Sequence, residues 1–426
     1  MQTPHPHSSQ SGAQVSRRAA DRLRNGHLWV YASDIETIEI PEAGTGRPSL
    51  LTVADSRGLL LGTALYSPTS QIALRLISRE AIDEAAWLEL LDARLRAAIQ
   101  RRKSILSEST NACRLCFSEA DELPGIIADK YGDLVILQLL AKGLDSPQVR
   151  DICVRALRDE LSPASILERP DPRVRELEGL SAPDAGPLYL AEGAAQGLAG
   201  PNATHFRINA LQFEYDPGSG QKTGAFLDQR DNYAAAQRWA QTLGAAKWAG
   251  GGRALDVCCY QGGFALHLAE VCRQVTGIDA SRASLEVAER NLTANRGRIH
   301  AEVDWVEGDA FQILRDWSGA GERFDAIVLD PPAFAKSRRA VEGALRGYKE
   351  LNLRALKMLN PGGLLVTCSC SHHVGWADLE NAVAMAAVDA GRRVRLLERR
   401  GAALDHPVVL NLPETEYLKC LLLEVE

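Results

Sequence analysis

Two cysteines near the C-terminal end of the chain are the residues best suited to covalent chemistry. Cys368 and Cys370 lie in the segment 367–371, directly after an apolar run that predicts a buried strand. A thiolate at the end of such a strand is a candidate nucleophile. The spacing does not decide which of the two reacts, because residues two apart on a strand face the same side. Cys370 lies nearer the following loop, where His372 and His373 are either a base beside the thiol or exposed residues without a role.

A second group of residues suited to chemistry follows another apolar run. Asp330 precedes Pro331, Pro332 and, after one alanine, Phe334. The prolines hold φ near about −65° and stiffen the loop. Asp330 can bond the edge of a flat base, and the ring of Phe334 can stack on it. The alternative is a rigid loop that only closes a strand. Because Asp330 and Cys370 both follow strands, we expect them to meet at one edge of a sheet.

A glycine-containing loop follows the first apolar run of the C-terminal half. Asp256 lies inside this predicted strand, and Tyr260, Gly262 and Gly263 lie in the turn that leads into a helix. Glycine lets the backbone approach a ligand closely, and the first amides of the helix point toward that ligand. The carboxylate of Asp256 is placed to hold an ammonium group. These residues therefore predict a loop that binds a small ligand.

Two further carboxylates end the next strands in order. Asp279 ends the second strand, where an acid can bond both hydroxyls of a ribose, and Asp309 follows the third, where it can accept from an adenine amino group. Each acid alone is more often a helix cap or a solvated residue. Together with Asp256 they predict S-adenosylmethionine rather than NAD, because the glycines lack the G-x-G-x-x-G spacing that cradles a pyrophosphate. Asp330, at the same edge, is also predicted to contact this cofactor.

These residues can meet only if the strands that precede them end at the same edge of one sheet. The C-terminal half of the chain has a sequence pattern that predicts such a sheet. From about residue 204, apolar strands alternate with helices, which is typical of a parallel sheet covered by helices on both faces. The expected strands are 254–258, 275–279, 324–330, 363–368 and a final 417–423, with a helix over 281–295.

The N-terminal half predicts two smaller modules, one of short β-like segments and one of mixed α/β pattern. The predicted boundaries are 1–14 for a disordered tail, 15–80 for the β-rich domain, 81–190 for the central α/β domain and 200–426 for the C-terminal domain. Inside the central domain we expect helices over about 82–106 and 146–161 and a connector, rich in Pro and Gly, over 169–187.

The composition excludes several classes of protein. With 426 residues, of which 46% are hydrophobic, the chain is an ordinary multidomain globular protein. A net charge of −7 argues against coating nucleic acid by bulk charge, although a local basic site stays open. No apolar run is long enough to span a membrane, and the N-terminus lacks a signal-peptide core. The nine cysteines are therefore expected to be free thiols in the cytoplasm. Cys113 and Cys116 form a lone C-x-x-C pair, so we predict no zinc site.

Several segments of the chain recur together in one known family. They are 26–30, 64–72, 121–126, 220–230, 330–334, 346–352, 369–371, 405–407 and 417–419. On these segments, which cover roughly residues 16–426, the chain resembles the bacterial 23S rRNA (cytosine-5)-methyltransferases of the type I large-subunit group, which carry an N-terminal PUA domain.

The resemblance implies an α/β fold. Its class I (Rossmann-like) methyltransferase domain would have a mostly parallel seven-stranded sheet, preceded by the small α/β domain and the β-rich PUA domain. It also implies S-adenosylmethionine as methyl donor and a cytosine of 23S rRNA as acceptor. The nucleophilic cysteine of the family falls on Cys370, whereas Cys368 lies where relatives need not have cysteine. The residues predicted to bind substrate are Lys222, Arg230, Pro331, Pro332 and Phe334.

The implied chemistry is addition of Cys370 to C6 of cytosine, which makes C5 reactive toward the methyl group. Asp330 would bond the N3/N4 edge and act as a general acid. The base that removes the C5 proton is unassigned, with water and His372 as alternatives. The target base must leave its stack to reach the pocket. A basic RNA-binding surface on the PUA domain, or else a solvated helix face, is predicted from Arg17, Arg18, Arg22 and Arg24.

Two other functions stay open from the sequence. An rRNA guanine-N7 methyltransferase of the same fold shares the Asp-Pro-Pro-x-Phe feature but needs no thiol, because N7 is already nucleophilic. A non-enzymatic RNA-binding ribosome assembly factor is the second alternative. The sequence gives neither the target nucleotide nor the oligomeric state, for which a homodimer is one alternative.

Overall fold

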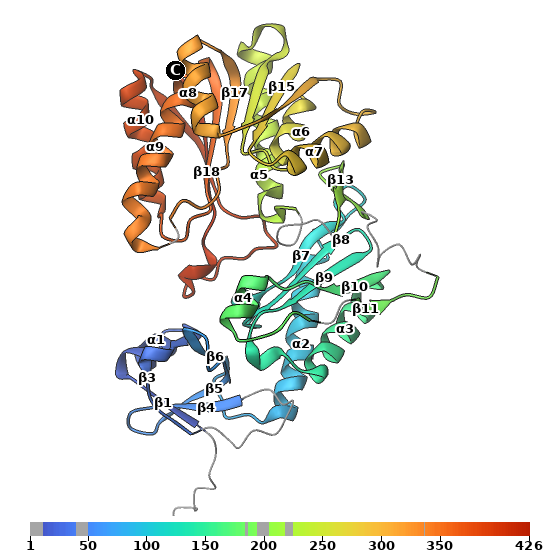
Figure 1. Cartoon of the computed structure of the whole chain (residues 1–426), viewed down its shortest axis with the longest axis vertical. Coiled ribbons are helices and arrows are strands. Elements are labelled where there is room, and N and C mark those ends of the chain that lie inside the picture. Colours follow the sequence, from blue (N-terminus) through green and yellow to red (C-terminus); the bar gives the residue numbers. More distant parts are fainter. Residues whose placement is uncertain (1–11, 40–49, 184–185, 194–203, 218–224, 336) are drawn as a thin grey trace, which may run out of the picture.

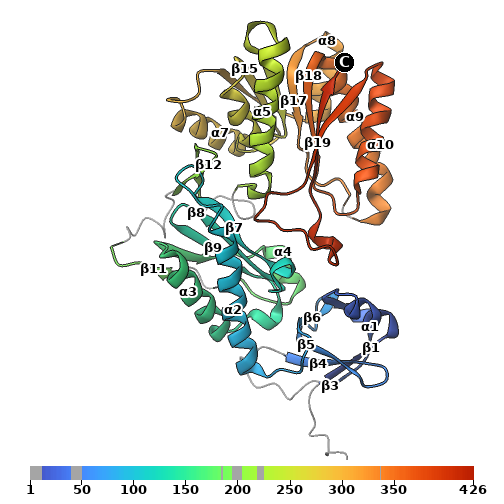
Figure 2. The ribbon, with the colours of Figure 1, turned by 180° about the vertical axis from the view of Figure 1, so that it is seen from behind.

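The computed structural model describes residues 12–39, 50–183, 186–193, 204–217, 225–335 and 337–426. Three regions follow one another along the long axis of the molecule, with the N-terminal residues at one end and the large C-terminal sheet at the other (Figure 1). The view from behind shows the same order (Figure 2). Among the described residues, none of the helices is both long enough and apolar enough to cross a membrane.

The N-terminal region is a six-stranded sheet with the order β2-β6-β5-β4-β1-β3 and one helix. The first strand corrects the predicted tail of 1–14, because Gly12–Val15 pair with both β3 and β4. Ala13 and Val15 are buried, so their alternation holds this segment in the sheet. The elements are β1 Gly12–Val15, α1 Arg17–Arg24, β2 Trp29–Tyr31, β3 Ile35–Glu39, β4 Leu50–Asp55, β5 Leu60–Tyr66 and β6 Ile72–Ser78.

Helix α1 carries the four arginines of the predicted basic surface, and the structure divides them. Arg22 forms an ion pair with Asp34, and Arg24 forms one with Asp55 at 2.5 Å. The side chain of Arg17 is 92% exposed, and Arg18 is also exposed. Arg22 and Arg24 are therefore largely neutralised by neighbouring carboxylates. Arg17 and Arg18 are the two arginines of this helix that present positive charge to solvent.

The central region is a five-stranded sheet with the order β11-β10-β9-β8-β7, packed on α2 and α3. Helix α2 begins after the cap Asp83 and is shorter than expected, whereas α3 begins after the cap Ser146 as predicted. The elements are α2 Glu84–Arg102, β7 Ala112–Phe117, β8 Ile126–Tyr131, β9 Leu134–Leu139, α3 Pro147–Leu161, β10 Ser165–Glu168, α4 Pro172–Leu177 and β11 Pro187–Leu190.

The stretch expected as a connector, 169–187, is partly helical. Asp171 caps α4 and Pro172 occupies its first turn, a combination that favours helix initiation. The carboxylate of Glu178, directly after this helix, accepts a hydrogen bond of 2.8 Å from the guanidinium of Arg75. Both groups are buried, so the segment joins the N-terminal sheet to the central region rather than linking them loosely.

The C-terminal region confirms the predicted mostly parallel seven-stranded sheet. Its order is β16-β15-β14-β17-β18-β20-β19, and β20 runs antiparallel to both of its neighbours. The elements are α5 Arg230–Lys247, β14 Arg253–Val257, α6 Gly263–Ala269, β15 Gln274–Asp279, α7 Arg282–Ala294, β16 Glu302–Glu307, α8 Ala310–Ala320, β17 Phe324–Leu329, α9 Val341–Met358, β18 Leu359–Ser369, α10 Trp376–Ala390, β19 Val394–Arg400 and β20 Lys419–Val425.

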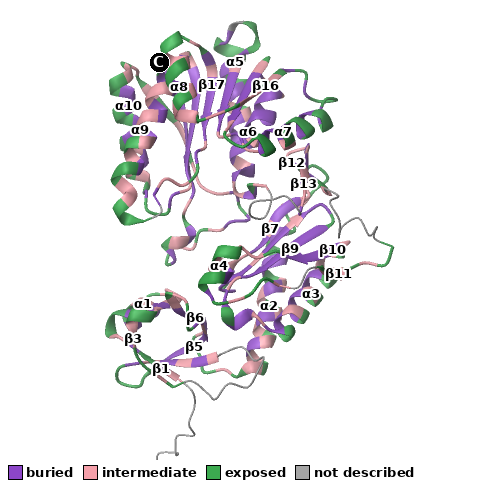
Figure 3. Cartoon of the chain, in the orientation of Figure 1, coloured by how far each residue is buried: buried purple, intermediate pink, exposed green. Residues whose placement is uncertain are grey.

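Helices cover both faces of this sheet. The core on one face contains residues of α5, α6 and α7, and the core on the other contains residues of α8, α9 and α10. Colouring by burial shows buried strands between helices that are exposed on their outer sides (Figure 3). The hairpin of β12 Thr204–Ile208 and β13 Leu211–Tyr215 extends the first core into the central region, where Tyr215 stacks on Tyr131 with centroids 4.5 Å apart.

A buried ion-pair network also joins the central and C-terminal regions. The Oδ2 atom of Asp405 accepts from the backbone amide of Arg114 at 2.8 Å and from the guanidinium of Arg230 at 2.9 Å. Its backbone carbonyl accepts from Arg102 at 3.1 Å. Burial alone would raise the pKa of Asp405, but the hydrogen bond from His406 and the charge of Arg230 hold it below its usual range.

We expect Asp405→Ala to lower the free energy of unfolding by about 3–5 kcal/mol, because it removes one of the two carboxylates that pair with the buried Arg230 and leaves the amide of Arg114 without its acceptor. The exposed Asp316→Ala is the matched control, with an expected change within about 0.5 kcal/mol. Urea unfolding followed by fluorescence measures both. Because the pKa of Asp405 is lower in the folded chain, its contribution is present above about pH 4 and declines on acidification. Equal midpoints for the two variants would contradict this role.

Candidate active site

A cavity of about 720 Å³ opens at the carboxyl ends of the central strands of the large sheet. From β14, the next strands along the chain, β15 and β16, extend the sheet on one side, and β17 and β18 extend it on the other. The gap between β14 and β17 is therefore the topological switch point of the sheet. Ligands of open α/β sheets bind at such a switch point. The predicted site residues that line the cavity are Asp256, Tyr260, Gly263, Asp279, Asp309, Asp330, Pro331, Pro332, Phe334 and Cys370.

The loop between β14 and α6 forms one wall of the cavity. Cys258 and Tyr260 both have positive φ, at 64° and 49°, which non-glycine residues rarely adopt. Such strained backbone is concentrated at functional sites. Gly263 lines the cavity, whereas Gly262 is the N-cap of α6 and lies against Trp305, whose Cη2 would be 3.1 Å from a Cβ at that position. Gly262 therefore shapes the loop rather than the cavity surface.

Asp256 is a buried carboxylate with one free oxygen. Its Oδ2 accepts from the backbone amide of Ala265 at 2.8 Å, while Oδ1 has no hydrogen-bond partner. Burial raises the pKa of Asp256 to about 8. A buried carboxyl oxygen without a partner is costly, so this atom is suited to accept from a cationic donor in the cavity.

Asp279 and Asp309 act as backbone caps and also line the cavity. The Oδ1 of Asp279 accepts from Ser281 and its Oδ2 from Tyr260, both at 2.9 Å. Asp309 caps α8 through a 2.9 Å bond from Gln312. Each carboxylate oxygen has a second lone pair, so capping and ligand binding are compatible. These hydrogen bonds hold the two carboxylates in fixed orientations at the cavity wall.

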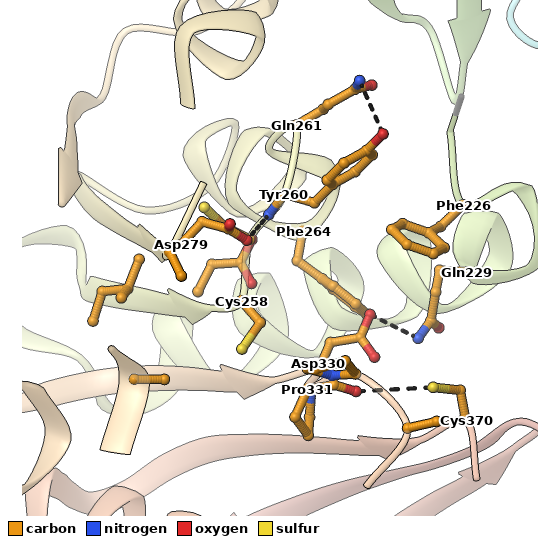
Figure 4. A pocket seen from close by; sticks show the side chains of 18 of the residues that line it. Phe226, Gln229, Cys258, Tyr260, Gln261, Phe264, Asp279, Asp330, Pro331 and Cys370 are labelled. Carbon is orange, nitrogen blue, oxygen red and sulfur yellow. Dashed lines mark hydrogen bonds between the residues drawn. The ribbon is translucent and has the colours of Figure 1, made fainter. Parts of the chain in front are cut away.

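Asp330 lies just after β17, and the amide of Gln229 donates to its Oδ2 at 3.0 Å (Figure 4). Its own backbone amide bonds to the carbonyl of Val257 at 3.2 Å. Burial and the neighbouring charge of Asp228 raise the pKa of Asp330 to about 7, although the bond from Gln229 acts in the opposite direction. Asp330 can therefore hold or release a proton near neutral pH.

The two prolines and Phe334 form the wall beyond Asp330. The Phe334 ring packs against Tyr348 and Phe311, with centroids 4.9 and 5.8 Å apart. Ala335 further anchors the loop by donating to the hydroxyl of Ser371 at 3.3 Å. The aromatic group is thus held in position before any ligand binds, which lowers the entropy cost of binding.

The structure separates the two cysteines that spacing alone left equal. Cys368 is fully buried opposite Cys420 of β20, and burial together with this neighbour raises its pKa well above the usual range. Strand β18 ends at Ser369, so Cys370 leaves the strand and lines the cavity. Its Sγ lies 3.9 Å from the carbonyl oxygen of Pro331 (Figure 4).

Two of the predicted substrate-binding residues are not placed in the cavity. Lys222 lies outside the described residues. The prediction for Arg230 is wrong, because its guanidinium is buried in the ion pair with Asp405 and a second pair with Asp231. Cavity residues that the sequence did not single out include Asp228, and Tyr417, whose hydroxyl donates to Asp228 at 2.5 Å. Both lie within segments that carried the resemblance, which was the available signal.

Family comparisons agree with this geometry. The profile described as S-adenosylmethionine-dependent methyltransferase matches residues 187–411, and a PUA-like domain profile matches residues 13–79. A protein of Erwinia tasmaniensis is 36% identical over 400 residues, which cover 93% of this chain and 95% of that protein. One of Pseudoalteromonas translucida is 37% identical over 411 residues, covering 95% and 96%. Both are named ribosomal RNA large subunit methyltransferase I.

The chain belongs to this methyltransferase family. Two solved structures support the fold: a candidate methyltransferase in complex with SAH and a candidate SAM-dependent methyltransferase from Streptococcus mutans. Each has a TM-score of 0.76 at 20% identity and covers 96% of this chain and 99% of its own. The predicted class I methyltransferase domain and the N-terminal PUA-like domain are thus confirmed.

As a member of this family, the chain is an enzyme whose cofactor is S-adenosylmethionine. The residues present fit that group. The unpartnered oxygen of Asp256 suits its ammonium, Asp279 suits the ribose hydroxyls, and Asp309 suits the adenine amino group. Tyr260, whose φ is positive, lines the same cavity as these acids.

We expect cofactor binding near pH 7 to release about one proton, because Asp256 has a pKa of about 8 and must ionise to pair with an ammonium. Titration calorimetry in two buffers of different ionisation heat measures this. Asp256→Asn should abolish the release and weaken binding about 10- to 100-fold. Asp304→Asn, on the exposed side of β16, is the control that should keep both. A wild-type binding heat that does not depend on the buffer would contradict the assignment.

Proposed function

We propose that this enzyme forms 5-methylcytosine in large-subunit (23S) rRNA through a covalent bond between Cys370 and the target base. The observation that carries the proposal is the pairing of a cavity-facing thiol with a carboxyl group that titrates near neutral pH. Cys370 lies beside the carbonyl of Pro331, and Asp330 immediately precedes that proline. An enzyme that methylates an already nucleophilic ring nitrogen has no need of this thiol.

The chemistry starts from the low reactivity of C5 in cytosine. Addition of the Cys370 thiolate to C6 forms an S–C6 bond and moves the ring electrons toward C5. Asp330, in its protonated form, donates to N3 and neutralises the charge that develops there. Bound S-adenosylmethionine supplies the electrophilic methyl group. The C5 proton then leaves, the S–C6 bond breaks, and N3 returns its proton.

The group that removes the C5 proton is proposed to be His372 or water. His372 lines the cavity, and its ring lies 5.5 Å from that of Tyr417. Burial and the charge of Lys419 lower the pKa of His372. A neutral imidazole is available near neutral pH and can accept a proton.

The substrate is proposed from the names of the relatives and from the PUA-like domain. The target cytosine would be turned out of its stack into the cavity between Cys370 and Phe334. Arg17 and Arg18 of α1 are exposed and would contact phosphates. With few such contacts and a net charge of −7, binding should weaken only modestly with salt. The free thiols also suit a cytoplasmic enzyme.

The direct test is to incubate the enzyme with isotopically labelled cofactor and large-subunit rRNA from cells that lack the modification. Digestion and mass spectrometry then identify the methylated nucleoside. Labelled 5-methylcytosine at one position supports the proposal. Labelled 7-methylguanine instead supports the guanine-N7 alternative, and rRNA binding without label contradicts the proposal.

A further inference from the structure

Lys419 places a buried positive charge beside the proposed nucleophile. The residue is 2% exposed at the start of β20. Its Nζ donates to the carbonyl oxygens of Ser371 and Tyr417, each at 2.8 Å. Within the described part of the chain, no carboxylate lies within ion-pair distance of this ammonium. Burying a charge without a counter-ion is costly, so the site calls for an anion.

The strand register brings this ammonium to the segment that contains the thiol. Lys419 pairs with Ser369 across the antiparallel ladder, and its side chain bonds the carbonyl of Ser371. Cys370 lies between these two residues in sequence. Lys419 therefore holds the backbone on both sides of Cys370, and the same contacts keep its charge near the sulfur.

Two carboxylates, Glu416 and Asp378, also act on the charge of Lys419, but both are at least partly exposed. Glu416 is exposed and accepts from the indole of Trp376 at 2.8 Å. Asp378 caps α10 by accepting from the amide of Gly375 at 2.9 Å. Both carboxylates contact solvent, which screens their attraction to a buried ammonium.

His372 also lies within reach of the charge of Lys419. Burial, Lys419 and His373 all lower the pKa of His372. Near neutral pH the imidazole is therefore uncharged, and it cannot serve as the cation of the site. This leaves Lys419 as the cation beside Cys370.

We propose that Lys419 is the positioning residue that holds Cys370 as a thiolate and fixes its loop for attack on the base. The inference rests on the proposed function, because only a covalent mechanism needs this thiolate. Burial lowers the pKa of Lys419, whereas the charges of Glu416, of a thiolate at Cys370 and of Asp378 raise it. Of these three groups, only Cys370 lies on the segment that the Lys419 ammonium holds in place. A nearby cation lowers the pKa of a thiol and increases its reactive fraction near pH 7. In the resting enzyme the thiolate is the counter-ion that Lys419 lacks.

The test is the rate of iodoacetamide alkylation of Cys370 in the full chain, measured between about pH 6 and 9 and read by peptide mass spectrometry. In the wild type we expect an apparent thiol pKa below the ordinary value of about 8.5. Lys419→Met removes the charge and should slow alkylation at pH 7 by about tenfold, whereas Lys419→Arg should stay within about threefold. Cys370→Ala provides the background from the other cysteines.

The outcomes separate this inference from the proposed function. A wild-type pKa of about 8.5 or above overturns the role of Lys419, and this result needs no variant to fold. Equal slowing in the Met and Arg variants also overturns it, because that pattern indicates a purely structural role. If Cys370→Ala still methylates rRNA, the covalent mechanism fails, but the alkylation profiles still decide whether Lys419 lowers the thiol pKa.

Discussion

Cys370→Ala should reduce methyl transfer to rRNA by at least about a thousandfold, because covalent catalysis loses its nucleophile. Cofactor affinity should stay within about twofold, since the proposed cofactor contacts lie on or directly after β14, β15, β16 and β17 and not after β18. The measurement is single-turnover transfer of labelled methyl groups to unmodified large-subunit rRNA, together with calorimetry of cofactor binding.

Cys368→Ala is the matched control for this variant. Cys368 lies two residues earlier but is fully buried, so its loss should leave methyl transfer within about threefold. RNA that carries 5-fluorocytosine at the target gives a second readout, because fluorine at C5 blocks the elimination that frees the enzyme. Wild type and Cys368→Ala should form an adduct that survives denaturation, and Cys370→Ala should not. Full turnover by Cys370→Ala would favour guanine-N7 methylation.

Asp330→Asn should reduce methyl transfer by about 100- to 10,000-fold, the range expected for loss of a general acid. Asparagine keeps the size of the side chain and an oxygen that can accept from Gln229 or from the cofactor, so cofactor binding should change little. The variant tests whether a proton on Asp330, rather than the shape of the loop, supports the reaction.

The pH dependence of the wild type gives a separate check on Asp330. The acid form is present below its pKa of about 7, so its contribution declines as pH rises through 7. Thiolate formation at Cys370 increases with pH, and the two effects together should give a bell-shaped profile. Asp228→Asn removes a charge that raises the pKa of Asp330, so the falling limb should move to lower pH. A limb unchanged in both Asp330→Asn and Asp228→Asn would contradict this assignment.

Much of the fold could be predicted because local patterns and tertiary packing agree. The central strands of the large sheet are short apolar runs, and the helix expected over 281–295 is α7, which Ser281 and Asn295 flank as its caps. Two segments were mispredicted. Strand β1 is polar on one side and is held by its partners β3 and β4. Helix α4 is short, and its Arg175 pairs with Asp145 of the loop before α3 and with Glu168 of β10. Such contacts leave little trace in the local sequence.

The sequence predicted which residue types stand at the ends of the strands. It did not predict which way each side chain points. The order of Asp256, Asp279 and Asp309 along the chain was enough to place them at one edge, because parallel strands end together. Whether Arg230 points into the cavity depends on Asp405, which is far away in sequence and buried with it.

The sequence by itself determined the strands that end at the site and the residues available for chemistry, because hydrophobic period and motif spacing are local properties. The class of enzyme came from the resemblance to one family. Only the tertiary structure decided that Cys370, and not Cys368, faces the cavity, since that depends on where β18 ends against β20. It also decided that Asp256 keeps an oxygen free and that Lys419 lies beside the thiol. The burial of an atom and the electrostatic potential at it depend on all of its neighbours in space. Folding brings these neighbours together from distant parts of the chain.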